Sequence, residues 1–258
     1  MFITEENASA IGVLESRMLE FYRQSASYLP FAEESCQPEL WEVVLSKARD
    51  ICARGECRIL EVGSGRSGFH RALTAAGLNG RAHYTAHDVT PANESFLREH
   101  ADAVLIGDPL AIAEPFDIVF HSFVLEHVSR PKAFLQHLFA TVRLGGFHIF
   151  SCPRYDVPGI LPPSARHLSI RARAAFHLVT LQRLLFRRPQ FPLLEDPAIF
   201  HIPYRRDRDA IHCVALSDIL RLHTGVATVD RFKVPAYSLR DWAVKRLMAL
   251  HLIIAKPA

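Results

Sequence analysis

Hydrophobic positions along the chain first recur at helical spacing and then fall into short apolar runs. The helical spacing covers residues 9–27 and 38–53, so we expect two helices near the N-terminus. Strands are expected at residues 58–62, 83–88, 101–108, 116–122 and 147–153, with helices at 68–77, 93–100 and 130–142 between them. Because apolar strands that alternate with helices are buried on both faces, this pattern predicts an α/β fold with a doubly wound, mostly parallel sheet.

The alternation stops in an arginine-rich stretch and resumes after it. Residues 154–208 hold ten arginines, only four acidic residues and many prolines. We interpret residues 154–210 as an insertion or lid within a single domain of residues 1–258, in which residues 1–54 form the N-terminal helices. A helix at 211–225, a strand at 226–234, and a helix or loop from 242 that leads to a last strand at 251–257 complete a predicted sheet of seven strands.

Within the insertion, residues 169–188 have the pattern of a basic amphipathic helix. One apolar stripe is formed by Ala174, Leu178, Leu181 and Leu185. Arginines at positions 171, 173, 183, 187 and 188 supply charge without a single acid. We expect a lid whose stripe packs on the domain and whose arginines face water. A second interpretation stays open, in which residues 164–189 contact an anionic membrane surface or another anionic ligand.

Composition and charge narrow the class of protein. With 258 residues, 49% of them hydrophobic, the chain can bury an ordinary core, and a net charge of +3 is too small to indicate nucleic-acid binding. The five cysteines form no C-x-x-C pair, so we expect reduced thiols. The N-terminus lacks a basic signal region, and no run reaches the roughly 18 apolar residues of a membrane span. These features predict a cytoplasmic protein.

The first predicted strand runs into a glycine turn that holds the strongest chemical signal. Glycines at 63, 65 and 68 satisfy the G-x-G-x-x-G fingerprint of dinucleotide binding, and Asp88 lies 20 positions beyond the last of them. A nicotinamide enzyme fits this spacing. Glu61 argues against it, because a carboxylate at the strand end would crowd a pyrophosphate. S-adenosylmethionine instead carries positive charge at its sulfur and its amine, which a carboxylate attracts.

Several motifs in order resemble the class I S-adenosylmethionine-dependent methyltransferases, in particular the small-molecule group that includes the ubiquinone-biosynthesis type. The resemblance covers residues 56–153 and 211–256. The matching stretches are ILEVGSGRSG, HDVTP, IGDP, FDIVFHSFVLEHVSRP and VRLGGFHIFSCP, and the last two strands resemble the reversed pair of this fold. One departure is Arg143-Leu144, where a proline often stands before the two glycines.

This resemblance implies S-adenosyl-L-methionine as cofactor and methyl transfer to a small-molecule acceptor, whose accepting atom is left open as oxygen, nitrogen or carbon. Glu61 would line the methionine and ribose, Asp88 would bind the ribose hydroxyls, and Asp108 would face the adenine amino group. The full predicted cofactor set is Glu61, Gly63, Ser64, Gly65, Gly68, Asp88, Val89, Asp108, Pro109 and His121. Two alternatives remain: a catalytically silent methyltransferase-like binding protein, and a nicotinamide-dependent oxidoreductase.

Methyl transfer needs a base only where the acceptor atom is protonated at the working pH. Our first choice is His127, which we expect to open the helix after the strand at 116–122, at the rim of the pocket, and His121 and His212 come next. Relatives with a Glu-x-x-Glu-His pattern bind a metal there, but Phe123 stands where the first glutamate would be, so we expect no metal. The chain also lacks the Pro-Cys and Asn-Pro-Pro-Tyr motifs of DNA base methyltransferases, so DNA is not an expected partner.

Overall fold

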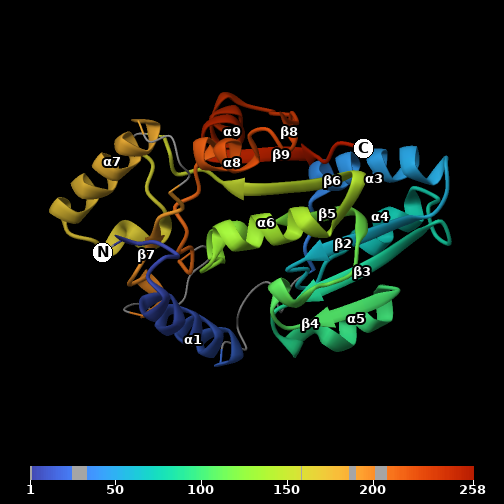
Figure 1. Ribbon diagram of the computed structural model, residues 1–258, viewed down its shortest axis with the longest axis horizontal. Helices are drawn as coiled ribbons and strands as arrows, with labels where there is room; N and C mark the ends of the chain where they lie inside the picture. The colour runs from blue at the N-terminus through green and yellow to red at the C-terminus, as the bar shows by residue number, and fades with distance from the viewer. Residues whose placement is uncertain (1, 25–33, 158, 186–189, 201–207) are drawn as a thin grey trace.

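A sheet of seven strands runs through the molecule in the order β4-β3-β2-β5-β6-β9-β8 (Figure 1). The computed structural model describes residues 2–24, 34–157, 159–185, 190–200 and 208–258. The strands are β2 (Cys57–Val62), β3 (Ala82–Asp88), β4 (Ala103–Ile106), β5 (Phe116–Ser122), β6 (Val142–Pro153), β8 (Thr228–Arg231) and β9 (Ala249–Ala255). The first five are parallel, and β9 is antiparallel to both of its neighbours. This confirms the predicted doubly wound, mostly parallel sheet with a reversed strand near its end.

Helices cover both faces of the sheet, as the alternation predicts. They are α3 (Pro38–Cys52), α4 (Phe69–Ala75), α5 (Glu94–His100) and α6 (Pro131–Thr141). Successive strand residues point to opposite faces. Ile59 therefore joins the core that contains residues of α3, α4 and α5, whereas Leu60 joins the core that contains residues of α6. Because the two cores cover both faces of the sheet, only the ends of the strands are left to form a site.

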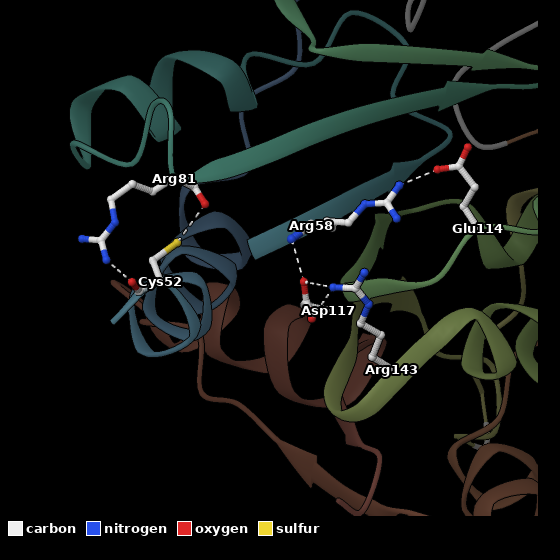
Figure 2. A network of polar contacts seen from close by, with 6 residues as sticks. All are labelled: Cys52, Arg58, Arg81, Glu114, Asp117 and Arg143. Carbon is white, nitrogen blue, oxygen red and sulfur yellow. Dashed lines mark hydrogen bonds and ion pairs between the residues drawn. The ribbon is translucent and has the colours of Figure 1, made fainter. Parts of the chain in front are cut away.

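A polar network closes the end of the sheet at which β2 and β5 begin (Figure 2). Oδ2 of Asp117 accepts a hydrogen bond from the backbone N of Arg58 at 2.7 Å and lies 3.1 Å from Nη1 of Arg143. In the same view, Sγ of Cys52 contacts the carbonyl O of Arg81 at 3.4 Å. Because these contacts join the amino ends of the strands, a ligand site is left to their carboxyl ends.

The N-terminal segment packs on the predicted insertion and away from the main sheet. The strand β1 (Phe2–Ile3) pairs with β7 (Leu193–Leu194), and α1 (Ala8–Gln24) follows it. A third core combines residues from both segments: Ile3, Ile11, Leu14, Met18, Leu193 and Ile211. The expected end of the first helix, at residues 25–27, lies outside the described residues. This core brings α1 to the rim of the sheet.

The helix predicted at 211–225 is shorter than expected. The helix α8 covers only Leu216–His223, and the residues just before it are buried but not helical. The backbone N atoms of Ile211 and His212 both donate to the carbonyl O of Glu126, at 2.7 and 2.8 Å, and the N of Cys213 donates to the O of Pro192 at 3.0 Å. These contacts with distant segments hold the stretch extended, which local periodicity could not reveal.

The prediction that the apolar stripe of the insertion packs on the domain is wrong. The helix α7 (Ile170–Leu185) forms where expected, but Leu178 and Leu181 are 56% and 50% exposed, and Ala174 is exposed as well. The side chain of Leu185 lies outside the described residues. The buried face of α7 carries Phe176, whose ring centroid lies 5.4 Å from that of Phe2. Contact with the N-terminal strand, and not the leucine spacing, decides which face is buried.

Candidate active site

A cavity of about 790 Å³ opens at the carboxyl ends of the parallel strands. Its wall is made by the ends of β2 and β3 and by the loops after β4 and β5, with further side chains from α1 and the segment before α6. Open α/β sheets bind their ligands at this position. The wall of the cavity includes Tyr22, Glu61, Gly63, Ser64, Gly65, His87, Asp88, Val89, Asp108, Pro109, His127 and Asp209.

The glycine turn after β2 is held tightly between neighbouring segments. Gly63 and Gly65 have φ of +68° and +55°, a region that side chains rarely adopt. A Cβ on Gly63 would lie 2.6 Å from Cγ2 of Val124. The N and the Oγ of Ser64 donate to the carbonyl O of His87 at 2.8 and 3.1 Å. The two glycines of the turn therefore present bare backbone to whatever occupies the cavity.

Glu61 places a buried carboxyl group at the end of β2. Its side chain accepts hydrogen bonds from Oγ of Ser67 at 3.0 Å and from the hydroxyl of Tyr84. Burial raises the pKa of Glu61 to about 7, against the opposing effect of these two hydrogen bonds. The group therefore changes charge near neutral pH. A cationic ligand fits such a site, because it would favour the ionised carboxylate.

Asp88 and Asp108 follow the next two strands. Asp88 is 3% exposed and accepts hydrogen bonds from the backbone N of Gly65 at 3.0 Å and of Thr90 at 3.1 Å. Burial raises the pKa of Asp88, and the backbone donors oppose that rise. Asp108 accepts from the N of Leu110 at 2.9 Å. Three acids therefore line one part of the cavity, which suits a ligand with positive charge and hydroxyl or amino donors.

His87 is a wall residue that the sequence interpretation missed. Its Nε2 lies 3.0 Å from the carbonyl O of Gly107 and so ties β3 to the loop that carries Asp108. Burial lowers the pKa of His87 to about 4, so the ring is neutral at pH 7 and donates from Nε2 to that carbonyl. In the sequence, only its position directly before Asp88 indicated that His87 could lie at the cavity.

Two of the predicted cofactor residues do not line the cavity. Gly68 is the N-cap of α4 and has Glu34 beside it. His121 is fully buried and stacks on Phe150 with ring centroids 4.6 Å apart, and burial lowers its pKa to about 3. The alternation of side chains along β5 explains this, because the next residue, Ser122, points to the opposite face and lines the cavity instead. His121 is therefore a core residue in this geometry.

His127 lies at the cavity beside a carboxylate from a distant segment. It ends a short 3₁₀ turn, η3 (Leu125–His127), and does not open α6 as we expected. Its Nδ1 is 3.2 Å from Oδ2 of Asp209, and the same oxygen accepts a hydrogen bond from the hydroxyl of Tyr22 at 3.0 Å. Oε1 of Glu126 is 3.8 Å from Nε2 of His127. The sequence interpretation named the histidine but neither Asp209 nor Tyr22.

Asp209 reaches this position because the chain after it is fastened to η3. The carbonyl O of Glu126 accepts two backbone hydrogen bonds from residues 211 and 212, and Nδ1 of His212 is 3.2 Å from the carbonyl O of Leu125. His212 is 1% exposed and lies outside the cavity wall, so it supports the turn and does not face a ligand. No local motif marks Asp209, which is why sequence alone could not find it.

Comparisons with known proteins agree with this geometry. Residues 60–150 match the family described as "Methyltransferase domain". The plantazolicin methyltransferase BpumL is 10% identical, with a TM-score of 0.55 over 99% of this chain and 100% of its own. A putative S-adenosylmethionine-dependent methyltransferase from Listeria monocytogenes (12% identical) and the YcgJ protein of Bacillus subtilis (11% identical) have TM-scores of 0.52 and 0.51, each over 86% of this chain and 100% of theirs. No curated protein matches the chain.

The structural likenesses, at such low identity, establish the fold. The family match assigns the chemistry, and it spans the stretch from β2 to β6 that carries Glu61, the glycine turn, Asp88 and Asp108. Neither finding supports the nicotinamide alternative. The subgroup within the family stays a prediction. Residues 60–150, which carry the glycine turn and the three acids, are a methyltransferase domain of the class I S-adenosylmethionine-dependent kind, with S-adenosyl-L-methionine as its cofactor.

Proposed function

We propose that the protein transfers a methyl group from S-adenosylmethionine to a small-molecule acceptor, with the cofactor and the acceptor sharing one cavity. The observation that carries this proposal is that the acid-lined glycine turn and the pair of His127 and Asp209 belong to the same cavity wall. Cofactor binding alone does not require a histidine oriented by a buried carboxylate, whereas proton removal from an acceptor does. That pairing argues against the catalytically silent alternative.

The cofactor would occupy the part of the cavity at the ends of β2, β3 and β4. Glu61 would attract the cationic methionine end, Asp88 would accept from the ribose hydroxyls, and Asp108 would accept from the adenine amino group. Gly63, Ser64, Gly65, Val89 and Pro109 would complete the binding surface. When bound, S-adenosylmethionine supplies a methyl group on a sulfonium, which needs no protein nucleophile.

The acceptor would lie beside α1 and η3. Nδ1 of His127 lies 3.2 Å from Oδ2 of Asp209, so the proposed base would carry its proton on Nδ1 and its lone pair on Nε2. Nε2 would take the proton of the acceptor oxygen, nitrogen or carbon when that atom is methylated, with S-adenosylhomocysteine as the second product. Asp209 and Glu126 then stabilise the imidazolium that forms. Met18 and Leu19 add apolar surface to the same wall, which favours an acceptor with an apolar body.

Release of S-adenosylhomocysteine from a panel of phenols, amines and activated carbon acids tests this function. We expect turnover with at least one class, and the class that reacts identifies the accepting atom. Binding of S-adenosylhomocysteine without turnover of any class would instead establish the silent alternative. Transfer by the His127→Ala variant at the wild-type rate, measured from low to high pH, would remove the base from the mechanism.

Two further predictions belong to this proposal. A cytoplasmic location and the lack of a DNA partner follow from composition and motifs, and cell fractionation together with DNA retention assays would test them. Contact of residues 164–189 with an anionic surface is now favoured over a packed lid, because the apolar stripe of α7 is exposed. Among the described residues, no helix is both long and apolar enough to cross a membrane. Any membrane contact of those helices would therefore be at the surface.

A further inference from the structure

The segment before β9 exposes a cluster of large apolar side chains that the function above does not use. It comprises the end of a loop, α9 (Leu239–Ala243) and the π-helical turn η6 (Val244–Met248). Tyr237 is 87% exposed, Leu239 83% and Trp242 47%, and a further set is more than two-fifths exposed: Val244, Leu247 and Met248. Single exposed apolar residues are ordinary, but six within twelve positions form a patch that indicates an interaction surface.

This patch is basic as well as apolar. Residues 231–248 contain five lysines and arginines and one acid, Asp241. Lys245 balances that acid at 3.3 Å and also lies 3.4 Å from Oε1 of Glu39. Among the side chains that the structure describes, the remaining positive charge in this stretch is carried by Arg231, Lys233 and Arg246. Tyrosine and tryptophan beside lysine and arginine are the side chains that proteins place at a membrane–water interface.

The helix α7 repeats this combination independently. Ile170 is 85% exposed and begins a stripe at positions i, i+4, i+8 and i+11 that continues through Ala174, Leu178 and Leu181. Residues at this spacing share one helix face. The stretch 157–194 around it contains six arginines and no acid, and two of those arginines, Arg166 and Arg171, are exposed. An exposed apolar stripe flanked by arginines is typical of helices that lie on anionic bilayers.

Both patches lie away from the β4 edge of the sheet. Figure 1 shows α9 at the top of the molecule beside β8, and α7 at its left, next to the α8 and α9 end of the molecule. Hydrogen bonds fasten η6 to the start of the insertion, since the N of Arg154 donates to the O of Met248 at 2.8 Å. The helix α8, which contacts α7, is joined to that same segment by a bond from the N of Leu216 to Oδ2 of Asp156 at 3.1 Å.

We propose that the protein docks on the surface of an anionic lipid bilayer through a docking face made by residues 237–248 and the exposed stripe of α7. Charge complementarity identifies the occupant. A second copy in a symmetric contact would place the same basic surface against itself, which like charges oppose. An anionic headgroup layer instead attracts the arginines, and its acyl boundary accepts the apolar side chains. Docking in this way would hold the enzyme at the layer from which an apolar acceptor is drawn.

Co-sedimentation of the full chain with vesicles tests the docking face. We expect binding to vesicles of equal phosphatidylglycerol and phosphatidylcholine, and weaker binding to pure phosphatidylcholine, by about fivefold for each basic side chain at the surface. Leu239→Glu and Leu178→Glu should each reduce the partition coefficient by about tenfold. The matched control is Leu144→Glu, because Leu144 is 74% exposed but lies beside the far end of β9, and it should bind as the wild type does.

Three results would overturn the docking face. They are no binding to the anionic vesicles, equal loss of binding in the Leu144→Glu control, or a dimer in light scattering that Leu239→Glu converts to monomer while neither form binds vesicles. The last would assign the face to a second copy. Calorimetry with S-adenosylhomocysteine, performed on every variant, shows that the fold is intact. Vesicle binding is measured without cofactor or acceptor, so a lack of vesicle binding would not contradict the proposed methyl transfer. In the same way, a lack of methyl transfer would not contradict vesicle binding.

Discussion

Nδ1 of His127 lies 3.2 Å from Oδ2 of Asp209, a residue 82 positions further along the chain. The carboxylate is 1% exposed and also accepts a hydrogen bond from the hydroxyl of Tyr22, so its orientation is set from two sides. In the proposed mechanism, a histidine held in this way would keep one ring nitrogen for the acceptor's proton. The relationship joins α1, the turn after β5 and the end of the insertion into one site.

The Asp209→Asn variant should lower kcat by about 10²- to 10⁴-fold, because the amide no longer fixes the tautomer and orientation of His127. Binding of S-adenosylhomocysteine should be unchanged. The matched control is Asp218→Asn, which alters another buried acid outside the cavity wall and should leave kcat near that of the wild type. Nitrogen-15 NMR offers a readout without acceptor: the Nδ1-protonated form of His127 should dominate in the wild type and be lost in Asp209→Asn. An unchanged tautomer would refute the role of Asp209.

The Glu61→Gln variant should be more stable and bind cofactor less well. The pKa of Glu61, about 7, is above its unfolded value, so the unfolded chain releases the proton first and stability falls as pH rises from about 4.5 to 7. The glutamine removes this loss and should raise the free energy of unfolding at pH 8 by about 1–3 kcal/mol. Urea denaturation at pH 5 and pH 8 measures the difference.

The same titration predicts the pH dependence of cofactor binding. If the cation binds the ionised form of Glu61, affinity for S-adenosylmethionine should rise by about tenfold from pH 6 to pH 8 and then level off. Calorimetry should find this rise in the wild type and none in Glu61→Gln. A parallel rise in both proteins would show that another group controls binding.

The Gly63→Ala variant tests the close approach at the glycine turn. The new Cβ would require an unfavourable positive φ and would lie 2.6 Å from a methyl group of Val124, so we expect a stability loss of about 1–3 kcal/mol and at least tenfold weaker binding of S-adenosylhomocysteine. Gly225→Ala is the control, since Gly225 has φ of +80° with no atom within 4 Å of its Cβ position. It should lose stability without losing affinity.

The Asp117→Ala variant separates stability from function. Its carboxylate accepts a partly buried backbone hydrogen bond from Arg58 and pairs with Arg143 at the end of the sheet remote from the cavity (Figure 2). We expect a loss of about 1–3 kcal/mol in unfolding free energy and no change in cofactor affinity. Glu114→Ala, which removes an exposed partner of Arg58, should cost less than about 1 kcal/mol. A large loss of affinity in Asp117→Ala would contradict this division.

Local pattern was sufficient for the sheet and for one part of the cavity. Apolar runs placed β2, β3, β4 and β5, and a parallel sheet brings their carboxyl ends together, so Glu61, Asp88 and Asp108 had to meet. The same reasoning misplaced His121, because a single position along a strand decides between core and cavity. It could not find His87's contact with Gly107, which depends on how two neighbouring strands pair.

The sequence by itself determined the α/β architecture, the glycine turn and the acids beside it, because each depends on residues close together in the chain or on strand order. Only the tertiary structure decided that Asp209 meets His127, that the stretch before α8 is extended, and that the leucine stripe of α7 faces outward. These outcomes depend on contacts between segments far apart in sequence. Such contacts compete with the local preference of a segment for helix or strand. Where a distant segment offers more apolar burial than the local structure does, the distant contact determines the conformation.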